Sequence, residues 1–87
     1  LGDANPGSEI VATGDILVMG TLRGMAHAGA AGDTSAIVAA FRLQPTQLRI
    51  ADVISRPPED KEQSPLFPEI ARLKDNMIVI EPYNSLK

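Results

Sequence analysis

The chain has neither cysteine nor tryptophan among its 87 residues, and aromatic side chains make up only 3% of it. The missing cysteine excludes a disulfide framework and any thiolate metal site, and it is compatible with a reducing cytoplasm. With so few rings, the core must be built from Ile, Val, Leu, Met and Ala, within a hydrophobic content of 44%. No apolar run approaches the roughly 20 residues that a membrane-spanning helix needs.

The chain also has no excess of basic residues. Acidic residues outnumber basic ones 11 to 8, the net charge is −3, and no run of Lys or Arg occurs. A basic nucleic-acid interface is therefore not predicted. The length indicates one small domain, which we place at residues 1–84 with a short tail at 85–87. The opening stretch over 1–6 does not resemble a signal peptide, and the sequence is interpreted as a piece of a longer chain.

Glycine is absent after residue 32. All seven glycines lie before it, at positions 2, 7, 14, 20, 24, 29 and 32, with short apolar stretches between them. Spacings of three to seven residues leave no room for a helix or a wide hairpin. They suit a chain that turns a corner, forms one short strand and turns again. This pattern predicts an all-β fold, a parallel β-helix of about four short coils.

The remaining strands are predicted from period-two alternation. We expect strands over 9–12, 15–19, 36–43, 48–54 and 77–80, with turns at 32–35, 44–47 and 74–76. A proline-rich, charged surface loop is expected over 55–69. The competing architecture is an Ig-like or SH3-like antiparallel fold. It needs turn residues between matched strands, and only the stretch over 74–76 has them.

The stretch over 15–19 is apolar on both faces. Ile16 and Val18 lie on one face, and Leu17 and Met19 lie on the other. Such a strand is buried on two sides. Leu17 and Met19 are therefore candidates for a subunit interface, although a second layer within the chain would explain them equally well.

Residues that carry chemistry are few. His27 is the only histidine and has no cysteine or clustered carboxylate beside it, so it is predicted to be a partly exposed strand residue and not a metal ligand. Glu59, Asp60 and Glu62 fall in the proline-rich loop, where solvation explains them. The stretch over 20–24 lacks the Gly-Lys-Ser/Thr ending of a phosphate loop. We predict no enzyme, no metal and no cofactor.

Arg23 is the one charged residue that stands out. Flanked by Leu22 and Gly24, it is expected to project from a rigid corner, where a fixed guanidinium suits a carboxylate or carbonyl of a partner. The alternative is a salt bridge to Asp15 or Asp33 within the chain. The sequence leaves both open.

Two neighbouring stretches carry a family resemblance. Residues 14–20 read Gly-Asp-Ile-Leu-Val-Met-Gly, and residues 22–33 read Leu-Arg-Gly-Met-Ala-His-Ala-Gly-Ala-Ala-Gly-Asp. Together with Leu-Arg-Ile-Ala at 48–51 and Ile-Val-Ile-Glu-Pro-Tyr-Asn at 78–84, they closely resemble the C-terminal domain of the bacterial septum-site inhibitor MinC. The resemblance covers most of the chain.

The resemblance implies a right-handed β-helix that forms a homodimer and has no catalytic activity. It further implies a cytoplasmic adaptor that binds the ATPase MinD, reaches the inner membrane face only through MinD, and contacts the tail of FtsZ to help block septum assembly. The family's N-terminal inhibitory domain and its Arg-Ser-Gly-Gln turn would precede Leu1. The partner-binding positions carried over are Gly7, Arg23, Gly24, Met25, Gly29, Gly32, Asp33 and Leu48.

Two other functions are alternatives to the adaptor. A β-helix acyltransferase or carbohydrate-active enzyme would need a supported catalytic histidine and, normally, a strict six-residue repeat. The glycine spacings of seven, six, four, five and three do not keep that frame, and His27 stands alone. A bactofilin-like structural polymer would stack similarly but lack the Arg-Gly-x-Ala-x-Ala-Gly string.

Overall fold

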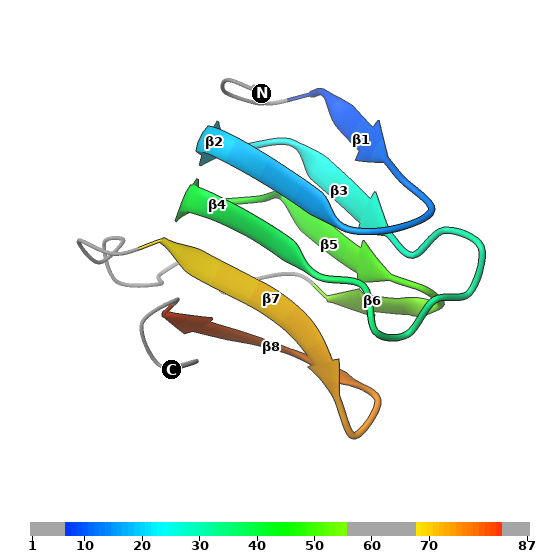
Figure 1. Cartoon of the computed structure of the whole chain (residues 1–87). Coiled ribbons are helices and arrows are strands. Elements are labelled where there is room, and N and C mark those ends of the chain that lie inside the picture. The colour runs from blue at the N-terminus through cyan, green and yellow to red at the C-terminus, as the bar shows by residue number, and fades with distance from the viewer. Residues whose placement is uncertain (1–6, 56–67, 83–87) are drawn as a thin grey trace.

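A computed structural model describes residues 7–55 and 68–82 and shows an all-β architecture. Eight strands form two four-stranded sheets, with the orders β1-β3-β5-β6 and β2-β4-β7-β8 (Figure 1). Within these residues no helix is long and apolar enough to cross a membrane. We refer to the sheets as sheet B (β1-β3-β5-β6) and sheet A (β2-β4-β7-β8).

The strands alternate between the two sheets along the first half of the chain. Sheet B contains β1 (Glu9–Val11), β3 (Met25–Ala28), β5 (Gln47–Ile50) and β6 (Val53–Ser55). Sheet A contains β2 (Ile16–Leu22), β4 (Val38–Leu43), β7 (Glu69–Lys74) and β8 (Met77–Pro82). The strand predicted over 36–43 is confirmed from Val38 to Leu43, and the last predicted strand is confirmed as β8.

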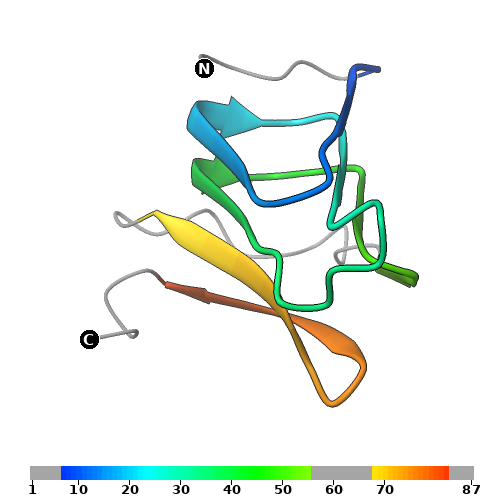
Figure 2. The ribbon, with the colours of Figure 1, turned by 45° about the vertical axis from the view of Figure 1, so that its right-hand side comes forward.

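Parallel pairing holds the first five strands together. β1 pairs with β3, β3 with β5, and β2 with β4, all in parallel. In Figure 2 the two successive layers of chain lie one above the other. Backbone hydrogen bonds between corners tie the layers: Met25 N donates to Ser8 O at 2.9 Å, and Thr46 N donates to Gly24 O at 3.0 Å.

The parallel β-helix prediction is nevertheless wrong. β5 pairs with β6, β4 with β7, and β7 with β8, all antiparallel, so both sheets are mixed. Within residues 7–55 and 68–82, the regular progression from corner to corner therefore stops after β5. The structure contains one chain, so the predicted dimer stays a prediction.

Two tight turns produce two of the three antiparallel pairings, β5 with β6 and β7 with β8. The segment over 48–54, predicted as one strand, reverses at Ala51, whose φ of 54° is left-handed, so that Ile50 pairs with Val53. The second turn joins β7 to β8 through Asp75 and Asn76, with φ values of 56° and 64°. Two consecutive left-handed residues are what a two-residue hairpin needs. The sequence signalled the second turn but not the first, since Ala rarely adopts positive φ.

The core lies between the two sheets and is entirely aliphatic. Its fully buried large side chains are Leu22, Leu43, Leu48, Ile50 and Val38. Alanines such as Ala26, Ala28 and Ala71 fill the remaining space, which keeps the sheets close. Each fully buried Leu, Ile or Val contributes about 1.5–3 kcal/mol to stability. The prediction of a core without aromatic rings is confirmed for the described residues.

A bulge interrupts the pairing of β2 with β4. Val18 pairs with Ala40 and Thr21 pairs with Arg42, so Met19 and Gly20 together face a single residue of β4. Gly20, expected at a corner, therefore lies within a strand. Such a bulge bends its strand locally and re-aims side chains. Here Met19 is left 61% exposed on the outer face of sheet A.

The corner after β3 depends on Gly29. Its φ is 60°, and a Cβ there would lie 2.2 Å from the carbonyl oxygen of Asp33. Gly14, in contrast, has nothing within 4 Å of the position that a Cβ would take. We expect Gly29→Ala to lower the free energy of unfolding by about 2–3 kcal/mol, because it adds left-handed strain to a backbone clash. Gly14→Ala should change it by about 0.5 kcal/mol or less.

Urea denaturation followed by circular dichroism measures both variants. Equal free energies of unfolding for Gly29→Ala and Gly14→Ala would contradict this account of the corner.

Candidate functional site

The predicted partner-binding residues fall on two opposite edges of sheet B. Because β1, β3 and β5 run parallel, their starts share one edge and their ends share the other. The entry edge, where these strands begin, carries Gly7, Arg23, Gly24 and Met25. The exit edge, where they end, carries Gly29, Gly32 and Asp33. The eighth residue, Leu48, lies within β5 between the edges.

At the entry edge, Arg23 is exposed and Gly24 is buried beneath the next layer, where its carbonyl accepts the Thr46 amide. Among the described residues, Arg23 forms no ion pair with Asp15 or Asp33. Asp15 instead accepts a hydrogen bond from the amide of Ile37 at 2.9 Å. The intrachain alternative for Arg23, a salt bridge to Asp15 or Asp33, is therefore wrong.

At the exit edge, Asp33 organises the turn that follows Gly32. Its Oδ1 accepts hydrogen bonds from Ser35 Oγ at 2.6 Å and from the Ser35 amide at 2.9 Å. These two bonds favour the charged carboxylate, the side-chain bond most, and lower the pKa of Asp33 below its usual 3.8. Gly32 allows the turn through a φ of 103°. Asp33 is thus a fixed, fully exposed negative charge.

Leu48 is fully buried and packs in the core. Its side chain cannot reach a partner, whereas its neighbours Gln47 and Arg49 point to the outer face of sheet B. Leu17 and Met19 behave differently. Both lie on the outer face of sheet A, 58% and 61% exposed.

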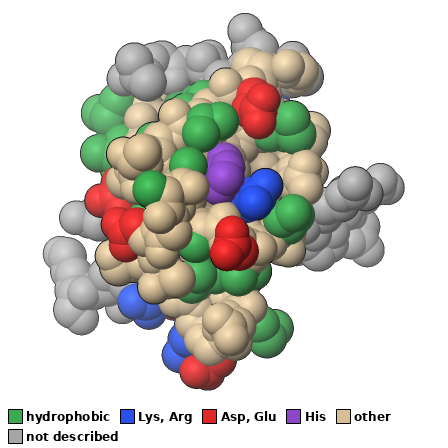
Figure 3. Space-filling model, turned by 90° about the vertical axis from the view of Figure 1, so that its right-hand side faces the viewer, with side chains coloured by type: hydrophobic (Ala, Val, Ile, Leu, Met, Phe, Trp, Pro, Cys, Tyr) green, Lys and Arg blue, Asp and Glu red, His purple; other side chains and the backbone are tan. Residues whose placement is uncertain are grey.

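A shallow pocket occupies the outer face of sheet B between the two edges. Strand register places Glu9, Met25 and Gln47 in one row, and Val11, His27, Arg49 and Ile54 in the next. Figure 3 shows the histidine near the middle of this face, beside a basic side chain and among apolar and acidic ones. The pocket has a volume of about 130 Å³ and is lined by Glu9, Met25, Ala26, His27, Gln47, Arg49 and Ile54.

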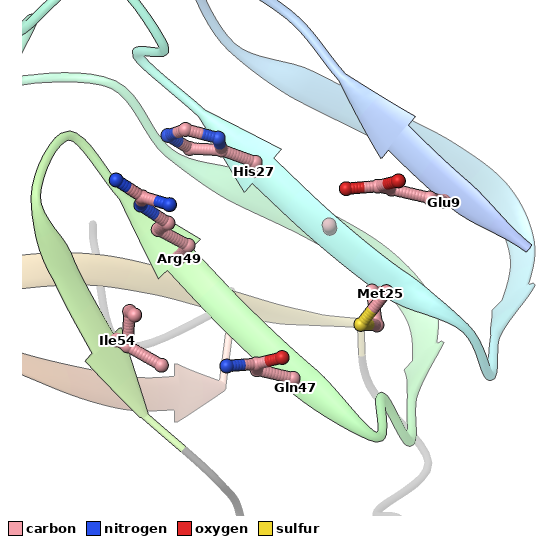
Figure 4. Close-up of a pocket in the computed structure, with 7 residues that line it drawn as sticks. Glu9, Met25, His27, Gln47, Arg49 and Ile54 are labelled. Atoms are coloured by element: carbon pink, nitrogen blue, oxygen red, sulfur yellow. The ribbon is translucent and has the colours of Figure 1, made fainter.

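One carbonyl organises the charged end of the pocket. The oxygen of Ala51 accepts a hydrogen bond from Arg49 Nε at 3.2 Å and lies 3.0 Å from His27 Nε2. The two side chains come from neighbouring strands and lie side by side in Figure 4. Ala51 therefore joins the left-handed turn to the pocket. The same turn carries Asp52, whose carboxylate lies 3.9 Å from Arg49 Nη2.

This pocket was missed from the sequence except for Met25. His27 was expected to be a partly exposed strand residue, which is confirmed, but its neighbours were not assembled around it. The available signal was the alternation shared by β3 (Met-Ala-His-Ala) and β5 (Gln-Leu-Arg-Ile). Once the two strands are paired, Met25 and His27 lie beside Gln47 and Arg49 on the same outer face. Without the pairing, Glu9 and Ile54 could not be assigned to the same face.

The side chains that line this pocket are suited to binding a ligand. It offers one guanidinium, one imidazole, one carboxylate and two apolar walls. Within residues 7–55 and 68–82, no group of three or more His, Asp or Glu side chains is placed to hold a metal ion.

The outer face of sheet A forms a second surface, of apolar character. Leu17 and Met19 on β2, Phe41 on β4 and Met77 on β8 are each at least half exposed. Near them, Arg72 and Glu81 form an ion pair, with Nη2 3.0 Å from Oε2. A face with this many exposed large apolar side chains is typical of an interaction surface.

Comparisons with known proteins agree with one another. The family model described as "Septum formation inhibitor MinC, C-terminal domain" matches residues 1–83. "Probable septum site-determining protein MinC" of Heliobacterium modesticaldum is 60% identical over 84 residues, which are 97% of this chain and 29% of that protein. The protein of the same description from Acetivibrio thermocellus is 61% identical, over 95% of this chain and 37% of that protein.

A solved structure is also similar. A chain of the "MinC:MinD cell division protein complex" of Aquifex aeolicus superposes with a TM-score of 0.84 at 41% identity. The match covers 94% of this chain and 66% of that chain.

This chain spans about a third of the length of the two curated relatives, and the match with the family model runs over nearly all of it. The chain belongs to the family of the C-terminal domain of the septum formation inhibitor MinC.

Proposed function

We propose that this chain is the non-catalytic adaptor domain of a bacterial division-site inhibitor, that it forms a homodimer, and that it binds the ATPase MinD. The observation that carries the proposal is the similarity to a chain of the MinC:MinD complex at 41% identity and a TM-score of 0.84. In this function the domain acts in the cytoplasm, reaches the membrane through MinD, and contributes to inhibition of FtsZ septum assembly through the FtsZ tail. It uses no cofactor and no nucleic acid.

The MinD contact is assigned to the entry edge and the adjoining outer face of sheet B. Arg23 supports this assignment because it is exposed beside the buried Gly24, and neither Asp15 nor Asp33 neutralises it. Gly7 lies on the same edge, and Met25 lines the pocket next to it. Rigid backbone around a single cation is well suited to a carboxylate or carbonyl of a partner.

The dimer contact is assigned to the outer face of sheet A. Leu17, Met19 and Phe41 are apolar and at least half exposed on neighbouring strands. A two-fold dimer uses the same patch on both subunits, so a mostly uncharged face can pack against its own copy without leaving charges unpaired. The domain itself is proposed to extend over 1–84.

The adaptor function predicts that Arg23 matters for MinD. We expect Arg23→Ala to weaken MinD binding about tenfold, because one charge-assisted contact is lost. Lys74→Ala, which removes an exposed cation at the β7–β8 turn, should leave binding unchanged. The measurement is co-sedimentation with MinD in ATP and in ADP, with circular dichroism as the control for folding. Unchanged affinity of a folded Arg23→Ala variant would remove the entry edge from the interface.

The dimer predicts that Leu17 matters for self-association. We expect Leu17→Asp to raise the dimer dissociation constant about 100-fold, because an unpaired charge would be buried between the subunits. Val11→Asp, at a similarly exposed apolar position on sheet B, should leave the dimer intact. Sedimentation velocity over a concentration series measures both. A Leu17→Asp variant that dimerises like the unsubstituted chain would place the interface elsewhere.

A further inference from the structure

The pocket on sheet B brings a cation and a titratable ring onto the same carbonyl. We propose that it takes one carboxylate side chain of MinD, and that protonation of His27 strengthens this contact. The inference rests on the proposed MinD binding and adds the chemistry of one subsite to it. His27 is thereby a specificity-determining residue.

The size of the pocket limits what it can hold. Its volume of about 130 Å³ is well below the roughly 300 Å³ at which sites for cofactors and drug-sized ligands begin. One Asp or Glu side chain is a suitable occupant. Met25 on β3 and Ile54 on β6 supply apolar walls for its methylene stem, and the polar side chains of Gln47 and Arg49 lie on β5 between them (Figure 4).

Arg49 is held in place with its outer nitrogens available. Its Nε donates to the Ala51 carbonyl at 3.2 Å, which fixes the plane of the guanidinium. The nearest acid, Asp52, lies 3.9 Å away, beyond hydrogen-bond distance, and its side chain is 98% exposed. Such a pair is weak, because water screens it. The terminal nitrogens of Arg49 can therefore bind an incoming carboxylate in bidentate geometry.

His27 changes from acceptor to donor when it is protonated. The Ala51 carbonyl can only accept, so the hydrogen bond at 3.0 Å requires the proton on Nε2. In the neutral ring Nδ1 is then the acceptor, and its lone pair opposes a carboxylate. A second proton turns Nδ1 into a donor and gives the ring a positive charge, while the bond to Ala51 is kept. A carboxylate thus gains a hydrogen bond and a charge interaction as the pH falls.

The charges around His27 favour this response. Glu9 on β1 and Arg49 on β5 line the pocket, and Asp52 lies on the turn after β5. Val11 and Ile54, in the same row as His27, are uncharged. Histidine is the only group among them whose ordinary charge change falls between pH 5 and 8. The charges of Glu9, Asp52 and Arg49 sum to −1, so protonation of His27 removes the net negative charge around the ring. Glu9 lines the same pocket, and its like charge opposes the carboxylate of the partner.

The test compares MinD affinity at pH 5.8 and 7.6 for the unsubstituted chain and for His27→Gln. MinD is loaded with a non-hydrolysable ATP analogue, and binding is followed by biolayer interferometry. We expect the unsubstituted chain to bind about five- to tenfold more tightly at pH 5.8, the range of one charge-assisted hydrogen bond. His27→Gln, whose amide can still donate to Ala51, should show less than about a twofold difference.

Further variants separate the pocket from the rest of the interface. Arg49→Gln should weaken binding about tenfold at both pH values, and Arg49→Lys should restore part of it. Glu9→Gln should strengthen binding about two- to threefold, because it removes a like charge. Lys74→Gln, at the β7–β8 turn of sheet A, is the matched control and should leave MinD binding unchanged. Circular dichroism at both pH values verifies that each variant is folded.

Each outcome decides one statement. Equal pH dependence in the unsubstituted chain and in His27→Gln would assign the effect to MinD and overturn the inference, as would Arg49 variants that bind normally. Absence of MinD binding by the folded, unsubstituted chain at either pH would overturn the proposed function itself. An Arg49→Gln effect on binding of the FtsZ tail, but not of MinD, would overturn MinD as the occupant of the pocket.

Discussion

The parallel register of β1, β3 and β5 is the constraint on which the rest of the structure depends. It aligns the corners before the strands on one edge and the corners after them on the other. It also places inward side chains such as Ala26 and Leu48 in one row, and outward side chains such as His27 and Arg49 in the next. A shift by one residue would exchange these faces and bury two polar side chains in an aliphatic core.

The turn at Ala51 is where this regularity ends. Its amide is bonded to Ala28 O at 2.9 Å, as for the next corner of a continuing stack, yet its left-handed φ sends the chain back as β6. The carbonyl of the same residue receives Arg49 and His27. Positive φ costs an alanine roughly 1–2 kcal/mol, and two side-chain hydrogen bonds to one carbonyl are of the size needed to offset it. The same residue, Ala51, therefore both turns the chain into β6 and positions His27 and Arg49 in the pocket.

The sequence allowed the all-β class, most strands of the first half and the aliphatic core to be predicted, because alternation and glycine corners are local signals. It did not allow the antiparallel half to be predicted. In Ala51-Asp52 the left-handed position is taken by an alanine, which does not mark a turn, and the conformation of Ala51 is supported by side chains from β3 and β5. Asp75-Asn76 does carry such a signal, and that turn was recognised. The partner-binding positions carried over from the family include Met25 of the pocket but neither Arg49 nor Glu9, which only strand pairing assigns to that face.

The outer face of sheet A is apolar, whereas the outer face of sheet B carries charged and polar side chains, so the two faces suit different kinds of contact. Sheet A presents Leu17, Met19 and Phe41, whose contribution on burial scales with area and hardly depends on pH. Sheet B presents a guanidinium, an imidazole and a carboxylate around one small pocket, whose contribution depends on charge and on geometry. Because the two sheets pack back to back through the core, a contact on one face leaves the other accessible. The proposed self-association and the proposed partner binding are therefore compatible, and the proposed response to pH is confined to the partner-binding face.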